Sequence, residues 1–218
     1  MNNMMKKKNL VYLGIIVAVL LFFIILFILL VNGMKAQKLA QFDQSIISFV
    51  QQFVSPSLTN VMKGITFFGS IKWLTTAVIV IALILFFQRK FALGLFVILA
   101  SGFGAFFNRW LKWLFKRERP DIFPIIEAQG FSFPSGHSMG AFIFYSSVAY
   151  LILHLSRSKV INLISTLFLF LFIIMIGLSR IYLGVHFPSD VVSGFVAGGA
   201  WLLICILIFR FYKYRKNR

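Results

Sequence analysis

The feature that most constrains this chain is a series of long apolar runs, each close to the length of a membrane-spanning helix. A helix needs about 20 apolar residues to cross roughly 30 Å of hydrocarbon. We expect such helices at residues 10–31, 73–87, 91–111, 137–155, 160–178 and 191–209. The second run has an uncertain outer boundary, which could lie as early as Val61. The runs therefore predict an all-α integral membrane protein with six transmembrane helices.

The composition agrees with this prediction. Only 12% of the residues are charged and 60% are hydrophobic, whereas a soluble domain carries about a quarter charged residues. The chain has no internal repeat of the kind that marks many transporters. We expect a single six-helix domain over residues 1–218.

The chain has a formal net charge of +17, which would also suit a nucleic-acid-binding protein. Such a protein concentrates its basic residues on one soluble face. Here they fall in the short segments before, between and after the apolar runs: Lys6–Lys8, Arg89 and Lys90, Arg157 and Lys159, and Arg210, Lys213, Arg215, Lys216 and Arg218. This is the positive-inside pattern of cytoplasmic loops. It argues against a nucleic-acid partner and predicts a cell-membrane protein with both termini in the cytoplasm.

The first outer loop is predicted to contain an amphipathic helix. Apolar residues recur at helical spacing from Leu39 to Phe53, which is typical of a helix at a membrane interface. The polar residues between them are Gln41, Asp43, Gln44, Gln51 and Gln52. Pro56, flanked by two serines, ends this pattern. Such a helix could cap the bundle as a packing element or gate access for a substrate.

Six spans with cytoplasmic termini place three polar stretches on the same outer face. The first runs from Lys112 to Pro120. Lys112 and Arg119 are seven residues apart, so on a helix that Pro120 ends they would point to one side. Two fixed cations suit an anion with several oxygens, because guanidinium can bind phosphate through parallel bonds. The alternative is that they anchor the interface, but the positive-inside rule puts them on the wrong side for that role.

The second stretch, Phe133 to Ser138, leads into the fourth apolar run. Ser135 is suited to cap a helix and Gly136 allows a close backbone approach. The free N–H groups at such a helix start can bind an anion. His137 would stand at this positive end, where it could protonate a leaving oxygen as a general acid.

The third stretch, Ser179 to Asp190, holds an arginine, a histidine and an aspartate at a membrane boundary. His186 and Asp190 are four residues apart, and Pro188 can start a helix between them. One turn would bring the carboxylate to the imidazole, so that one ring nitrogen is held and the other is free to attack. Arg180 would stabilise charge on a transferred phosphoryl group. A metal site is the competing interpretation, but the neighbouring cations would repel a metal ion.

In order along the chain, the three stretches read K-x6-RP, PSGH and SR-x5-H-x3-D. This trio resembles the signature of the type 2 phosphatidic acid phosphatase (PAP2) superfamily, which includes integral membrane lipid phosphatases. The motifs are complete and span residues 112–190. Outside them, the resemblance extends only to the six-helix layout.

The resemblance implies a role for each motif residue. His186 would form a phosphohistidine intermediate, Asp190 would hold it, and His137 would protonate the leaving group. The phosphoryl oxygens would be bound by the remaining motif residues, namely Lys112, Arg119, Ser135, Gly136 and Arg180. Neither a metal nor another cofactor is implied, because positioning and fixed positive charge do most of the work in phosphoryl transfer.

The sequence also predicts roles for other polar residues near the motifs. Lys116, Arg117 and Glu118 occupy variable positions of the first motif. Asn108 and Arg109 could support the site from one helical turn away. The remaining predictions are a solvated loop for Asp121 and Glu127, an interfacial place for Tyr182, and a structural role for His154.

The implied function is hydrolysis of the terminal phosphate of a membrane lipid at the outer face. Small bacterial members of the family resemble phosphatidylglycerophosphate, phosphatidate and undecaprenyl diphosphate phosphatases, and no motif here distinguishes their substrates. A lipid phosphotransferase with the same site remains open, as does, with less support, a non-catalytic lipid-phosphate transporter. The sequence leaves the oligomeric state undetermined.

Overall fold

The computed structural model describes residues 2–120 and 124–216. Within these ranges every regular element is a helix, which confirms the all-α prediction. The helices are α1 (Asn2–Lys35), α2 (Ala40–Gln51), α3 (Pro56–Phe67), α4 (Ile71–Phe87), α5 (Phe91–Phe115), α6 (Gly136–Leu155), α7 (Lys159–Tyr182) and α8 (Pro188–Lys216).

Five of these helices, α1, α5, α6, α7 and α8, are each long and apolar enough to cross a membrane. Helices α3 and α4 reach this length only together, with a bend of 45° between them. At the bend, Ser70 caps α4 by accepting a hydrogen bond from the Trp73 N–H at 3.2 Å. The second predicted span is therefore a broken pair, and counting the pair as one span gives the six that the sequence predicts.

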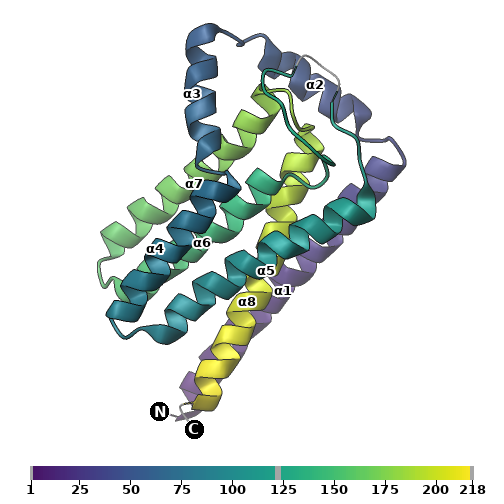
Figure 1. The fold of residues 1–218 in the computed structure, drawn as a ribbon. Coiled ribbons are helices and arrows are strands. Elements are labelled where there is room, and N and C mark those ends of the chain that lie inside the picture. Colours follow the sequence, from purple (N-terminus) through teal and green to yellow (C-terminus); the bar gives the residue numbers. More distant parts are fainter. Residues whose placement is uncertain (1, 121–123, 217–218) are drawn as a thin grey trace.

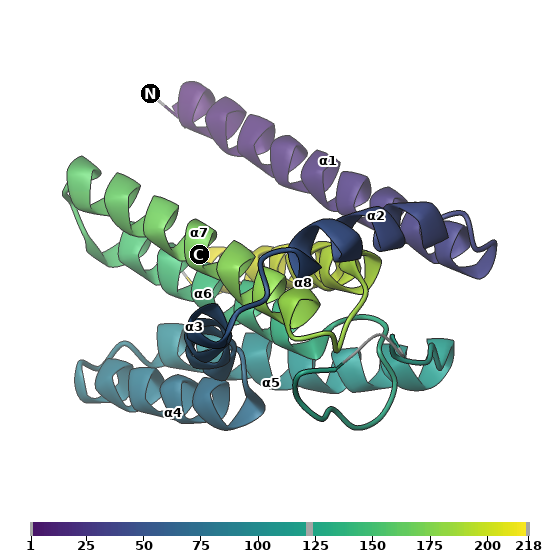
Figure 2. The same ribbon diagram turned by 90° about the horizontal axis from the view of Figure 1, so that it is seen from above.

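The most buried helices lie at the centre of the bundle. Helix α6 packs against α5, α7 and α8, while α1 lies on the outside along α8 (Figure 1). Figure 2 shows this layering from above, with α1 at one edge and α4 at the other. The apolar side chains of α1 are largely exposed, among them Phe22, Ile25 and Leu29. Such a surface is what lipid contact requires of a spanning helix.

The two ends of the bundle hold different parts of the chain. Both termini lie at one end, whereas α2 and the segment after α5 lie at the other (Figure 1). All three polar stretches meet at the end that is far from the termini. The termini and the motifs thus lie at opposite ends of the bundle, as the positive-inside pattern predicts.

Helix α2 is the predicted amphipathic helix. It buries Asp43, Ile47 and Val50 against the bundle and exposes Phe42 and Phe49 on its outer side. Its apolar contacts join a cluster around the α7–α8 connection. The buried face thus carries one carboxylate, that of Asp43, among apolar side chains.

Candidate active site

The first motif does not lie on one helix. Helix α5 ends at Phe115 because Lys116 takes the left-handed conformation (φ 47°, ψ 34°), with its N–H donating to the Lys112 carbonyl. Arg119 therefore lies on the following loop, and Pro120 does not end the helix. The predicted helical spacing of the two cations is wrong, although both reach the same site.

Backbone carbonyls hold these two cations in place. Lys112 Nζ donates to the carbonyls of Phe131 and Ser132. Arg119 donates from Nε to the Gly130 carbonyl (2.9 Å) and from Nη1 to the Val185 carbonyl (2.8 Å). The loop between α5 and α6 is thereby wrapped around the two positive charges.

The third cation, Arg180, projects from the last turn of α7 and is buried. Its Nη1 donates to Thr66 Oγ1 at 2.8 Å. Among the residues that the structure describes, neither Arg180 nor Lys112 nor Arg119 forms an ion pair with a carboxylate. Burying uncompensated charge is costly, so this cluster is suited to bind an anion.

The PSGH turn starts α6 as predicted. Ser135 caps the helix by accepting hydrogen bonds from the Ser138 N–H (3.4 Å) and the Ser138 hydroxyl (2.9 Å). In the described part of the chain, the N–H groups of Gly136 and His137 have no hydrogen-bond acceptor. They form an anion site at a helix N-terminus. The Ser135 hydroxyl itself is fully buried in the cap.

His186 and Asp190 meet across the start of α8. Asp190 Oδ2 lies 3.5 Å from His186 Nδ1, a longer separation than an ordinary hydrogen bond, and Nδ1 has no hydrogen-bond partner among the described residues. The same Oδ2 accepts a hydrogen bond from the Phe187 N–H at 3.0 Å. The other ring nitrogen, Nε2, lies 3.3 Å from Arg119 Nη1 and faces the cations.

The environment of His186 favours its neutral form. Burial, together with the positive charges of Lys112, Arg180 and Arg119, holds the pKa of His186 well below its ordinary value of 6.5. Only a neutral imidazole has the free lone pair that a nucleophile needs. Burial also lowers the pKa of Arg119, but a guanidinium remains charged in proteins.

His137 is the second residue of α6, next to the helix N-terminus that forms the anion site. It is close enough to Arg180 and His186 to interact electrostatically with both. The α3–α4 bend packs directly against it, because a Cβ on Gly69 would lie 3.2 Å from His137 Cβ and Cδ2. The bend in the second span therefore borders the candidate general acid.

Two residues that the motifs do not specify, Arg117 and Asp43, complete the site. Arg117 donates from Nη1 to Asp190 Oδ1 (2.7 Å) and from Nη2 to Asp43 Oδ2 (2.9 Å). Sequence reasoning left Arg117 at a variable position and counted Asp43 only among the polar residues of the amphipathic helix. One signal could have found Asp43: it precedes Ile47 by one helical turn, which places it on the apolar face.

A PAP2 superfamily model matches residues 89–214 of this chain, more than half of its length. The chain belongs to the PAP2 superfamily. It is 35% identical over 187 residues to phosphatidylglycerophosphatase B of Bacillus subtilis, a match that covers 84% of this chain and 89% of that protein. It is 29% identical to a lipid A 1-phosphatase of Rhizobium etli, over 66% of this chain and 68% of that protein.

The structural comparison agrees with the sequence comparisons. The fold matches the crystal structure of a transmembrane PAP2-type phosphatidylglycerolphosphate phosphatase from Bacillus subtilis with a TM-score of 0.81 and 31% identity. The match covers 87% of this chain and 94% of that one. This chain is therefore a multi-pass membrane PAP2 enzyme of the lipid phosphatase type.

The structure also tests the predictions for three polar residues near the motifs, Asn108, Arg109 and Tyr182. Asn108 does support the PSGH turn, since its Nδ2 lies 3.4 Å from the Pro134 carbonyl, but Arg109 is exposed. Tyr182 is wrongly predicted as interfacial: it is buried, and its hydroxyl accepts a hydrogen bond from the Ser55 N–H at 3.1 Å.

The remaining predictions concern His154, Glu127 and Asp121. His154 is near the C-terminal end of α6, far from the PSGH turn at its start, and its Nε2 lies 3.3 Å from Lys213 Nζ. Glu127 is exposed, in agreement with a solvated loop. Asp121 lies outside the described residues.

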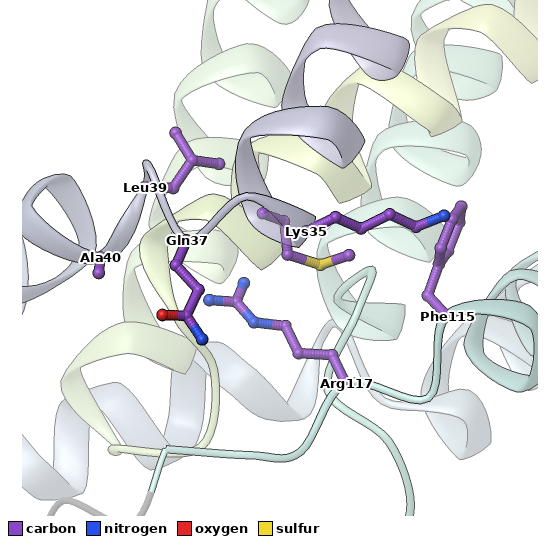
Figure 3. Close-up of a pocket in the computed structure, with 7 residues that line it drawn as sticks. Lys35, Gln37, Leu39, Ala40, Phe115 and Arg117 are labelled. Atoms are coloured by element: carbon purple, nitrogen blue, oxygen red, sulfur yellow. The ribbon is translucent and has the colours of Figure 1, made fainter.

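A cavity of about 390 Å³ borders this PAP2 site from the α1–α2 side. Figure 3 shows Lys35 and Gln37 from the end of α1 and the following turn, with the Arg117 side chain extending toward Gln37. Neither histidine of the motifs lines the cavity. It is thus an opening beside Arg117 rather than the phosphate site.

Proposed function

We propose that this chain hydrolyses the terminal phosphate of a membrane lipid through a phosphohistidine intermediate on His186, without a metal ion. The observation that carries this proposal is the cluster of Lys112, Arg119 and Arg180, whose positive charges act on His186 and which has no ion-pair partner among the described residues. A phosphate dianion supplies the missing negative charge. The same cations oppose the binding of a metal ion at this position.

In the first step, His186 Nε2 attacks phosphorus, and the bond from phosphorus to the lipid oxygen breaks. The electron pair of that bond goes to the leaving oxygen, which takes a proton from His137. Binding of the phosphate anion favours the protonated form of His137 before this step. The cations and the free N–H groups of Gly136 and His137 stabilise the charge on the transferred phosphoryl group.

In the second step, water attacks the phosphohistidine. His137, now neutral, takes a proton from this water, and the phosphorus–nitrogen bond breaks with its electron pair returning to Nε2. Asp190 keeps the imidazole oriented through both steps by facing Nδ1. Inorganic phosphate leaves, and the site returns to its initial protonation state.

Phosphatidylglycerophosphate is the first substrate to test. The proposal rests on the 35% identity to phosphatidylglycerophosphatase B, and the lipid tail would remain in the bilayer while the headgroup enters the cationic site. Phosphatidate and undecaprenyl diphosphate present the same terminal phosphate. Side-by-side assays of the three lipids therefore identify the preferred one.

The test is a phosphate-release assay on the purified protein in detergent, with no added metal and with a chelator. We expect turnover under these conditions. His186→Ala should abolish turnover, while His154→Ala, which removes an exposed histidine far from the site, should leave it unchanged. Loss of activity with chelator would contradict the metal-free mechanism, and full activity in His186→Ala would contradict the assigned nucleophile.

We also propose that the site faces away from the cytoplasm and that both termini face the cytoplasm. This topology rests on the basic residues near the termini and on the separation of the termini from the motifs (Figure 1). A Glu127→Cys variant in a Cys205→Ala background should react with a membrane-impermeant thiol reagent in intact cells. Labelling only after lysis would place the site on the cytoplasmic side.

A further inference from the structure

A buried cluster of charge lies on the side of Asp190 that faces away from the phosphate site. Arg117 lies between two carboxylates, 2.7 Å from Asp190 Oδ1 and 2.9 Å from Asp43 Oδ2. Both carboxylates are buried, with side-chain exposures of 0% for Asp190 and 3% for Asp43. A buried carboxylate without a partner is costly. Arg117 therefore stabilises the carboxylates of both Asp190 and Asp43.

The contact with Arg117 fixes the orientation of the Asp190 carboxylate group. Its Oδ1 is occupied by Arg117 and its Oδ2 by the Phe187 N–H, which leaves Oδ2 beside His186 Nδ1. The guanidinium of Arg117 is itself held against the Phe187 ring, with Cζ 4.1 Å from the ring centroid. Arg117 therefore limits rotation of the group that faces the imidazole.

Asp43 fixes the other side of this arrangement from α2. Its Oδ1 accepts a hydrogen bond from the Ser189 N–H at 2.8 Å, and its Oδ2 accepts one from the Ser189 hydroxyl at 2.7 Å. Ser189 is in the first turn of α8, where backbone N–H groups lack partners within the helix. Asp43 thus caps α8 from another helix while it also binds Arg117.

We propose that Arg117 and Asp43 are a positioning pair for the reaction at His186: Arg117 orients Asp190, and Asp43 locks Arg117 and the start of α8 to α2. This inference rests on the proposed function, because its effect is on turnover through His186. It gives the amphipathic helix α2 a definite part in the enzyme. The site is fully assembled only when α2 is docked.

The first test compares single variants of the pair. We expect Arg117→Ala and Asp43→Asn to lower kcat by about 10–100-fold, in the range of other residues that orient a reacting group, with KM nearly unchanged. Arg117→Lys should recover part of the loss because it keeps the charge. The matched controls are Lys116→Ala and Glu118→Gln, which remove exposed charges on either side of Arg117 and should keep the wild-type kcat.

The second test is chemical rescue of Arg117→Ala. The cavity beside Arg117 gives a small cation access to the vacated position (Figure 3). Millimolar guanidinium should raise the kcat of Arg117→Ala several-fold and in a saturable manner, and it should not raise the kcat of Lys116→Ala. A purely structural ion pair would lower the unfolding temperature without any rescue of turnover.

The double variant tests whether the two residues act together. Because part of the Asp43 effect passes through Arg117, the loss in the double variant should be smaller than the product of the two single losses, whereas independent effects would multiply. Wild-type kcat in Asp43→Asn and Arg117→Lys, with His186→Ala inactive, would overturn the positioning pair and leave the proposed function intact. Should Arg117→Ala fail to fold, these two milder variants decide the question. Full turnover in His186→Ala would overturn the proposed function itself.

Discussion

The two charged clusters beside His186 differ in whether their charges form ion pairs within the protein. On one side, Arg117 is shared by Asp43 and Asp190, so every charge has a partner within the protein. On the other side, Lys112, Arg119 and Arg180 are held by neutral oxygens, such as backbone carbonyls and a threonine hydroxyl. We call these the paired cluster and the unpaired cluster. The paired cluster is complete without a ligand and can position a group, whereas an anion completes the unpaired cluster.

The largest effect should come from the residue that joins the two clusters. We expect Asp190→Asn to lower kcat by up to about 10⁴-fold, as in a catalytic triad where an amide holds the wrong imidazole tautomer. The inhibition constant for inorganic phosphate should change little, because the three cations remain. An equal loss of phosphate binding would show that the clusters are not separate in function.

A change within the unpaired cluster should weaken phosphate binding as well as turnover. Arg180→Met should lower kcat/KM by about 10²–10³-fold, the usual loss when one stabilising donor is removed, and should also weaken inhibition by phosphate. The control is Arg109→Met, which removes an exposed arginine from α5. Unchanged phosphate inhibition in Arg180→Met would contradict the role of this cluster in anion binding.

A smaller effect is expected where the broken span meets the site. A Cβ on Gly69 would lie 2.6 Å from Ile176 Cγ2 and 3.2 Å from His137, so Gly69→Ala should displace the general acid. We expect a loss of kcat of about 10-fold, since small misplacements of reacting groups are costly. Gly64→Ala is the matched control, because its Cβ would meet nothing within 4 Å. It should keep wild-type kcat and raise the unfolding temperature.

The smallest effect concerns pH. The pKa of His186 is lowered in the folded protein, so the unfolded chain takes up its proton first as the pH falls below about 6.5. His186 thus favours the folded state above that pH, and this contribution is lost as the solution becomes more acidic. The acid limb of kcat/KM that belongs to His186 should lie below its ordinary pKa.

Arg119→Gln sharpens this prediction, because it removes one of the positive charges that lower the pKa of His186. The acid limb should move to higher pH in the variant relative to the wild type. Titration of the substrate phosphate does not affect the difference between the two acid limbs, because both enzymes are assayed with the same lipid. An acid limb that moves to lower pH would contradict the electrostatic origin of the shift.

The sequence was sufficient to predict the five unbroken spans and the motif residues, because long apolar runs and complete motifs are local signals. His186 and Asp190 are brought together by a single helical turn, which spacing can predict. Arg119 was misplaced because one left-handed residue, Lys116, ends α5 a turn before the motif does. Helical spacing cannot predict such a break.

The paired cluster was missed for a different reason. Asp43 and Arg117 are 74 residues apart, and their contact depends on how α2 docks on the bundle. Asp43 looked like one of the polar residues of an interfacial helix, yet it lies on the buried face. Only the tertiary arrangement turns the variable motif position Arg117 into a partner of Asp190.

The central claim is that His186 carries the phosphoryl group. The direct measurement is rapid quenching of the enzyme with a lipid labelled at its terminal phosphate with ³²P, followed by peptide mapping. We predict acid-labile, base-stable label on the peptide that contains His186, formed before phosphate release and absent from His186→Ala. Label on another residue, or phosphate release by His186→Ala at the wild-type rate, would contradict the account.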